Sequence, residues 1–315
     1  TLGGLTETGN AYTVTVTDAS VDAAALNTLD GKTTVNVNAA AVGTLTGTAA
    51  AIDTAINAST IDSGAAVAVN VNSGSATVAQ ANSIAAQTSG VVTATISETD
   101  MTTLGGLTET GNAYTITVND ASVDAAALNT LDGKTTVTVN AAAVGTLTGT
   151  AAAIDTAINA STIDTDAAVV VNVNSGSATV AQANSIAAQT SGVVTASISD
   201  TAISTLSGLT GLGNAYTITV GDASVNAADL NTLDGKTTVN VNASSVTTLT
   251  GTAAAIDTAI NASTIDTGAA VVVNVNDGSA TVAQANSIDA QTSGVVTASI
   301  SDTDLATLGS LSGTG

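Results

Sequence analysis

Residues 14–38, VTVTDASVDAAALNTLDGKTTVNVN, combine two structural patterns in one short stretch. The alternating valines and threonines at each end are typical of β-strands, whereas the alanine- and leucine-rich middle is typical of a helix. A strand, a helix and a second strand joined by short connections predict parallel strands with right-handed crossovers. The stretch therefore predicts an α/β fold built from strand-helix coils.

The same pattern recurs along the chain with a period of 102 residues. Its tyrosines, Tyr12, Tyr114 and Tyr216, lie 102 residues apart in the segments GNAYTVTV, GNAYTITV and GNAYTITV. The periods cover residues 1–102, 103–204 and 205–306, and 307–315 begin a fourth. Such repetition predicts one continuous array over residues 1–315, in which stacked coils bury their apolar faces against each other. Because the chain begins and ends at nearly the same phase, we expect it to be a segment of a longer array.

Each period divides into about four strand-helix coils. In the first period the strand patterns lie at Val14–Val16, Val35–Val37, Val69–Val71 and Ala94–Ile96. The expected helices are Val21–Leu29, Ala49–Ala58 and Ala76–Gln87, with Ser20, Thr48 and Ser75 as N-caps, and a short turn within Asp100–Leu107. The long step from Val35 to Val69 is expected to hold two loops, 39–47 and 59–66, and to protrude.

Coils of this length are in the range of leucine-rich-repeat coils, and the small apolar residues Ala, Val, Leu and Ile suit a thin core. We therefore predict a right-handed α/β solenoid, with a parallel sheet along one side and short helices along the other.

The composition argues against several classes of function. The chain has no Cys or His, so it has no disulfide, no zinc site of the usual kind and no imidazole base, and we predict that it is not an enzyme. Only 3 cationic residues stand against 25 acidic ones, for a net charge of −22. This balance disfavours binding to nucleic acid or to an anionic membrane surface. No apolar run is long enough for membrane insertion.

The outer face of the predicted sheet is rich in hydroxyl and amide groups. If alternate residues of each strand point outward, stacking of the coils aligns five of them in one column. These are Thr15, Asn36, Asn70, Thr95 and Thr117. The column is interpreted either as ladders that satisfy one another, or as a face that binds another copy or a polysaccharide. Ice binding by threonine rows is a third alternative.

Acidic residues follow two neighbouring predicted strands. Glu98 and Asp120 should lie on adjacent coils, and Asp200 and Asp222 repeat the pair. Two close carboxylates repel unless one is protonated or a cation lies between them, and calcium takes such oxygen ligands. The alternative is that each carboxylate accepts hydrogen bonds at a helix start. The sequence thus offers calcium as the one candidate cofactor.

Two segments carry a resemblance to a known class of protein. Residues 75–97, SATVAQANSIAAQTSGVVTATIS, and the opening stretch 14–38 resemble the Ala/Thr-rich tandem repeats of very large bacterial cell-surface proteins, common in cyanobacteria and often described as adhesins. The resemblance implies an extracellular or cell-surface location and a role as a stalk, surface layer or filament. For such a structural repeat we predict self-association through the Thr/Asn face or the long coil between Val35 and Val69. Adhesion to glycans or to a surface is the alternative function.

Overall fold

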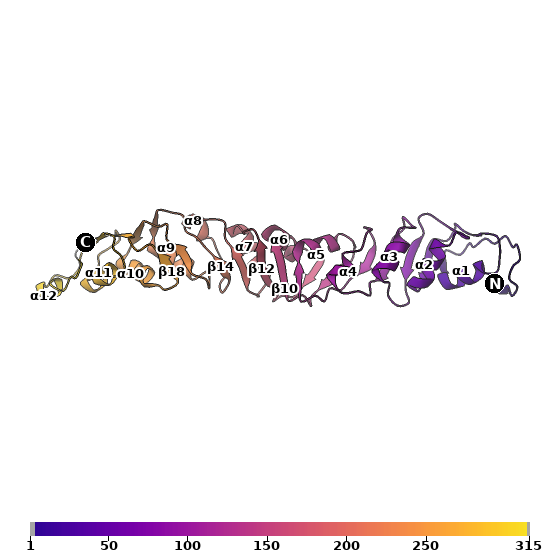
Figure 1. Ribbon diagram of the computed structural model, residues 1–315, viewed down its shortest axis with the longest axis horizontal. Coiled ribbons are helices and arrows are strands. Elements are labelled where there is room, and N and C mark those ends of the chain that lie inside the picture. Colours follow the sequence, from indigo (N-terminus) through magenta and orange to yellow (C-terminus); the bar gives the residue numbers. More distant parts are fainter. Residues whose placement is uncertain (1–3, 314–315) are drawn as a thin grey trace. The chain divides into compact units, whose positions relative to one another are not determined.

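The computed structural model describes residues 4–313, so the predicted array boundaries at residues 1 and 315 lie outside the described residues. Helices and parallel strands alternate along the chain (Figure 1). The chain forms two compact units. The first extends to Thr146 and includes Thr156–Asp166, and the second comprises Leu147–Asp155 and the residues from Ala167 onward. The division falls within β10 (Thr146–Thr150) and α6 (Ala151–Asn159).

The first compact unit contains β-α modules, each consisting of a helix and the strands before it. Its helices are α1 (Ala23–Asp30), α2 (Ala49–Asn57), α3 (Val78–Ala85), α4 (Met101–Leu104) and α5 (Ala125–Asp132). The main parallel sheet has the order β1 (Ser20–Asp22), β3 (Thr44–Gly47), β5 (Ala68–Val71), β6 (Val92–Thr95) and β7 (Ala113–Thr115). Two small parallel pairs are β2 (Val37–Ala39) with β4 (Ile61–Ser63), and β9 (Val139–Ala141) with β11 (Ile163–Thr165); β8 is Ser122–Asp124.

The second compact unit repeats the same arrangement. Its helices are α7 (Val180–Ala187), α8 (Ile203–Leu206), α9 (Ala227–Asp234), α10 (Ala253–Asn261), α11 (Val282–Asp289) and α12 (Leu305–Leu308). Parallel strands β12 (Val170–Ser175), β13 (Val194–Ser197) and β14 (Ala215–Thr217) are neighbours in that order. A second sheet has the order β15 (Ser224–Asn226), β17 (Thr248–Gly251), β19 (Val272–Val275) and β20 (Val296–Thr297), and β16 (Val241–Ala243) pairs with β18 (Ile265–Thr267).

The prediction of an α/β fold with parallel strands is confirmed, but each compact unit contains more than one sheet. The two segments expected to be loops, 39–47 and 59–66, each contain a strand, β3 and β4. Leu45 in β3 is 1% exposed and pairs with Val21 and Val69, so strands on both sides hold this short segment in the sheet. The prediction that the coil between Val35 and Val69 protrudes was therefore wrong, because its residues form β3 and β4 and pair with neighbouring strands.

The expected second strand was placed two residues too early. Val35 is 37% exposed, whereas Val37 and Ala39 are fully buried, and β2 begins at Val37. Both placements preserve the alternation of apolar and polar residues, so the pattern alone did not distinguish them. The first three helices start at Ala23, Ala49 and Val78, so successive helix starts are 26 and 29 residues apart and the first modules are similar in length.

Helix caps explain where the helices begin. Thr48 caps α2 as predicted, accepting a hydrogen bond from Ala51 N at 3.2 Å. The predictions of Ser20 and Ser75 were wrong. Asp22, the last residue of β1, caps α1 by accepting a hydrogen bond from Ala25 N, and Thr77 caps α3 through a reciprocal capping box with Gln80.

The core consists of small and medium apolar side chains from both elements. Val69 and Val92 from neighbouring strands are buried, as are Leu26 and Ile52 from neighbouring helices. The alternating exposure of strand residues and the i, i+3 spacing of buried helix residues match the two periodicities of the sequence. The largest buried side chains include Tyr114 in the first compact unit and Tyr216 in the second.

Candidate functional site: polar contacts between modules and an uncovered last module

A polar cluster joins α2 to α3 in the first compact unit. Ser83 donates its hydroxyl to Asp53 Oδ1 at 2.6 Å, and the Asn57 amide donates to the same oxygen at 2.9 Å. The 2.6 Å bond recurs in the second compact unit for the pairs Ser185–Asp155 and Ser287–Asp257. The sequence period is therefore also a period of contacts between modules.

Asparagine side chains on the helices bind the backbone of the next module. The Asn82 amide donates to the Gly106 carbonyl at 2.7 Å, and its Oδ1 accepts from Thr108 N at 3.0 Å. Asn184 makes the equivalent pair of bonds to Gly208 and Thr210. One side-chain amide thus satisfies a backbone carbonyl and a backbone N–H of residues 106–108, which belong to no strand.

The last residue of α1 binds the module that follows. Asp30 Oδ2 accepts the Thr60 hydroxyl at 2.7 Å, while Asp30 Oδ1 is buried and has no hydrogen-bond partner among the described residues. Asp132 and Asp234 have the same arrangement. The carboxylate therefore holds two modules together with only one of its oxygens.

Each of the four carboxylates considered for calcium accepts a hydrogen bond from the first backbone N–H of a helix. In the first compact unit, Glu98 Oε2 accepts from Val78 N at 3.1 Å and Asp120 Oδ2 from Met101 N at 2.8 Å. In the second, Asp200 accepts from Val180 N at 2.7 Å and Asp222 from Ile203 N at 2.6 Å. These bonds place the carboxylates at the starts of α3, α4, α7 and α8 and supply the interaction that the alternative interpretation required. Calcium binding stays a prediction.

Asp100 and Asp304 are a further pair of helix-capping carboxylates, and both are fully exposed. The backbone N–H and then the hydroxyl of Thr103 lower the pKa of Asp100, because both donate hydrogen bonds to its charged form. Thr307 lowers the pKa of Asp304 in the same way.

The strand register separates the five residues of the predicted polar column. Thr15 lies opposite Asn38, while Asn70 lies between Thr46 and Thr93. Thr95 lies opposite Thr115, Thr117 opposite Asn140, and Asn36 donates to the Ser59 carbonyl at 3.3 Å. All except Thr117, which is half-buried, are exposed. Asn70 pairs with a threonine on each side, and a role of the five residues as an interaction face stays a prediction.

A buried asparagine joins β6 to β7. Asn112 is 5% exposed, and its Oδ1 accepts from Val92 N at 2.9 Å. In the second compact unit, Asn214 accepts from Val194 N at 2.8 Å. No local pattern predicts this role, because the donor lies 20 residues before the acceptor. The residue's place in the recurring GNAYT segment was the only available signal.

The tyrosine beside each buried asparagine is itself buried. Tyr114 and Tyr216 are 1% and 0% exposed, and neither hydroxyl has a hydrogen-bond partner among the described residues. Burial raises the pKa of both to about 12, and the negative charge of Glu109 adds to the effect at Tyr114. Tyr12, the equivalent residue of the first period, is 36% exposed.

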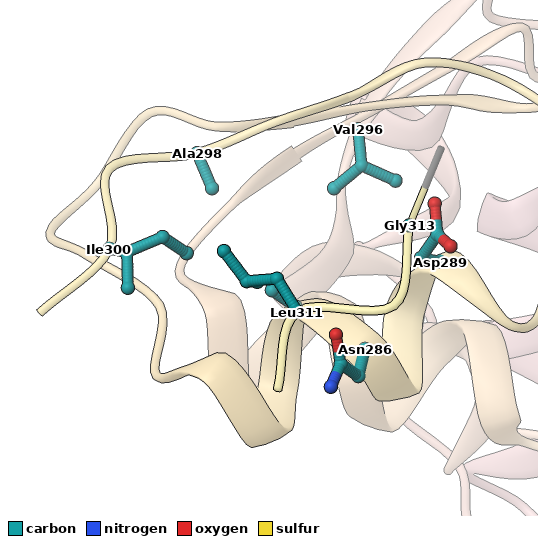
Figure 2. Close-up of a pocket in the computed structure, with 8 residues that line it drawn as sticks. Asn286, Asp289, Val296, Ala298, Ile300, Leu311 and Gly313 are labelled. Atoms are coloured by element: carbon teal, nitrogen blue, oxygen red, sulfur yellow. The ribbon is translucent and has the colours of Figure 1, made fainter. Parts of the chain in front are cut away.

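The last described module has an uncovered apolar end. Val296, Ala298 and Ile300 are half-exposed, and Figure 2 shows their side chains beside Leu311, which is 45% exposed. They line a hollow of about 220 Å³ with Ala285, Asn286, Asp289 and Gly313. The equivalent residues of the first period, Val92, Ala94 and Ile96, are at most 4% exposed.

Comparison of the chain with protein-family models, with curated proteins and with solved structures finds no match in any of the three. Across residues 4–313, no helix combines the length and the apolar character needed to cross a bilayer. The same residues hold no cluster of three or more His, Cys, Asp or Glu side chains arranged for a metal ion.

Proposed function

We propose that the chain is a structural, non-enzymatic repeat region of a large secreted bacterial surface protein. Its modules stack as a right-handed α/β solenoid, and the protein extends by adding modules. The Ala/Thr-rich repeats resemble those of giant cell-surface proteins, and the high negative charge favours solubility. The function is to span distance and to assemble into a filament or surface layer.

The observation that carries this proposal is the recurrence of contacts between successive modules. The Ser83–Asp53 bond and the two bonds of Asn82 each join one module to the next, and both contacts recur in the second compact unit. A module of this kind leaves polar and apolar groups unsatisfied until a neighbour is added, which is the property expected of a repeat array. In this proposal the side chains of Ser83, Asp53 and Asn82, and their equivalents in the second compact unit, hold successive modules together.

Electron microscopy of the native material tests the proposal. Fibres or sheets with a regular axial repeat, labelled at the cell surface by an antibody against this chain, are the expected result. Dispersed single particles, or labelling confined to the cell interior, would overturn it.

A second candidate function is adhesion to a polysaccharide. The exposed hydroxyls and amide of Thr93, Thr95 and Asn70 favour it, because sugars are bound through such groups. Glycan-array binding that is lost in Asn70→Lys and kept in Thr54→Lys, where Thr54 is an exposed residue on α2, would support adhesion. No binding by the wild-type chain would exclude it. Ice binding is disfavoured because alanine, asparagine and threonine alternate across the strands, as in the Asn70–Thr93–Ala113 row.

A further inference from the structure

We propose that an exposed apolar row on the sheet of the second compact unit pairs with the same row on a second copy of this chain. The row consists of Val170, Val193 and Leu212. This inference rests on the proposed structural function and names one surface through which copies associate side by side. A contact between two identical patches is isologous and closes as a two-fold pair.

The strand register brings the three residues of the apolar row together. Strands β12, β13 and β14 are parallel neighbours in that order. Extended by one residue, the pairing of β12 with β13 sets Val170 beside Val193. Extended by two residues, the pairing of β13 with β14 sets Val193 beside Gly213, which directly follows Leu212. The exposed fractions are 39% for Val170, 45% for Val193 and 73% for Leu212.

A polar row lies beside the apolar row on the same face. It contains Asn172 and Thr195, which are paired across β12 and β13 and are both exposed. An exposed apolar patch with a polar rim is typical of a contact between proteins. A stable interface covers about 800 Å² per partner, more than three side chains provide. We therefore expect the pair to cover the polar row as well and to be weak.

The equivalent row of the first compact unit, 102 residues earlier in the chain, is less apolar and carries a charge. It consists of Ala68, Val91 and Thr110, and the residue before Thr110 is Glu109. Gly211 replaces this acid in the second compact unit. The three differences, alanine to valine, threonine to leucine and glutamate to glycine, therefore all make the second row more apolar.

The loss of Glu109 at this place indicates which partner covers the second row. The chain has a net charge of −22, so a second copy would be repelled by an acid at the contact, whereas a cationic partner would be attracted by it. A two-fold contact would also bring such an acid close to its own counterpart. An acid is gained at Asp166, where the first period has Gly64, but Asp166 follows β11 and belongs to the first compact unit. Gly211 thus favours a second copy as the partner.

A matched pair of substitutions in the full chain tests the inference. Val193→Thr changes the centre of the row, and Val91→Thr makes the same change at the equivalent residue of the first compact unit, which is 50% exposed. Sedimentation and light scattering at about 0.5 M salt, where charge repulsion is screened, measure the dissociation constant of the wild-type dimer. Val193→Thr should raise this constant at least about tenfold, because residues at the centre of an interface dominate its affinity. Val91→Thr should leave it unchanged.

Exchange of residues between the two rows tests the same surface with side chains that the fold already accepts at equivalent positions. Leu212→Thr gives the second row the residue of the first and should weaken the dimer as Val193→Thr does. The triple variant Ala68→Val, Glu109→Gly and Thr110→Leu gives the first row the residues of the second. A chain with two such rows should form species larger than dimers, whereas wild type stops at two chains.

Three outcomes would overturn the inference. Equal effects of Val193→Thr and Val91→Thr would show that copies associate through another surface. A wild-type chain that stays single at every salt and protein concentration, while native material forms fibres or sheets, would show that the row does not pair although the structural function stands. A single chain that binds phosphatidylcholine vesicles, with binding lost in Leu212→Thr, would assign the row to a lipid surface.

Failure of the proposed structural function gives a different result. Wild-type dimers that Val193→Thr disrupts, together with dispersed particles in the native material, would overturn the structural function and leave the pairing of the row in place.

Discussion

The Ser83 hydroxyl lies 2.6 Å from Asp53 Oδ1, although 30 residues separate the two in the chain. Both residues are half-buried and lie on successive helices. The bond is short because its acceptor is a carboxylate. The same length at Ser185–Asp155 and Ser287–Asp257 makes it a marker of module spacing.

Removal of this hydroxyl should loosen the contact between α2 and α3. Because hydrogen bonds to charged groups contribute about 1.5–3 kcal/mol when buried, and this one is half-exposed, Ser83→Ala should cost about 1 kcal/mol of unfolding free energy. Ser59→Ala is the control, since Ser59 is exposed and its change should stay within about 0.5 kcal/mol. Hydrogen exchange of α2 and α3 measures the effect locally. Equal exchange in both variants would contradict it.

Gly90 lies where no side chain fits. A Cβ at this position would meet the Val67 carbonyl oxygen at 2.4 Å and the Ala66 carbonyl oxygen at 2.7 Å. Because both contacts are with backbone, Gly90→Ala should destabilise the first compact unit by at least about 2 kcal/mol. Gly31→Ala is the matched control, since its nearest atom is 3.6 Å away and its φ of −66° suits alanine. Thermal unfolding compares them, and similar melting temperatures would refute the argument.

The sequence predicted well where one local pattern was enough. Thr48 followed by an alanine- and isoleucine-rich stretch defined α2 and its cap, because both signals lie within a few residues. Leu45 and its strand were missed, because burial of that residue depends on neighbours 24 residues away on either side. Asn112 and Ser83 were missed for the same reason: their partners lie 20 and 30 residues away, and no local spacing encodes such contacts.

The helix-capping carboxylates allow a direct test of the calcium hypothesis. Asp120 Oδ2 already accepts from Met101 N, so a chelator should leave the melting temperature unchanged. Asp120→Ala should cost about 1 kcal/mol, because it removes a charged acceptor from the start of α4. Asp62→Ala, at an exposed residue of β4, controls for the lost charge. A lower melting temperature in chelator, restored by calcium, would show instead that these carboxylates bind the ion.

The two buried tyrosines make stability depend on pH in the alkaline range. Burial raises the pKa of Tyr114 and Tyr216 to about 12, whereas an unfolded tyrosine has a pKa of about 10. Between these values the unfolded chain loses protons that the folded chain retains. The contribution of these two tyrosines to the free energy of unfolding is therefore fully present below about pH 10, and it is lost as the pH rises to about 12.

Replacement of both tyrosines by phenylalanine isolates this effect. Neither hydroxyl has a hydrogen-bond partner among residues 4–313, so the double variant should be at least as stable as wild type at neutral pH. Between about pH 10 and 12 its melting temperature should fall less than that of wild type, because the double variant lacks the two hydroxyls whose pKa is raised by burial. Melting curves across this range provide the comparison. An equally steep fall in both proteins would show that the buried hydroxyls do not control alkaline stability.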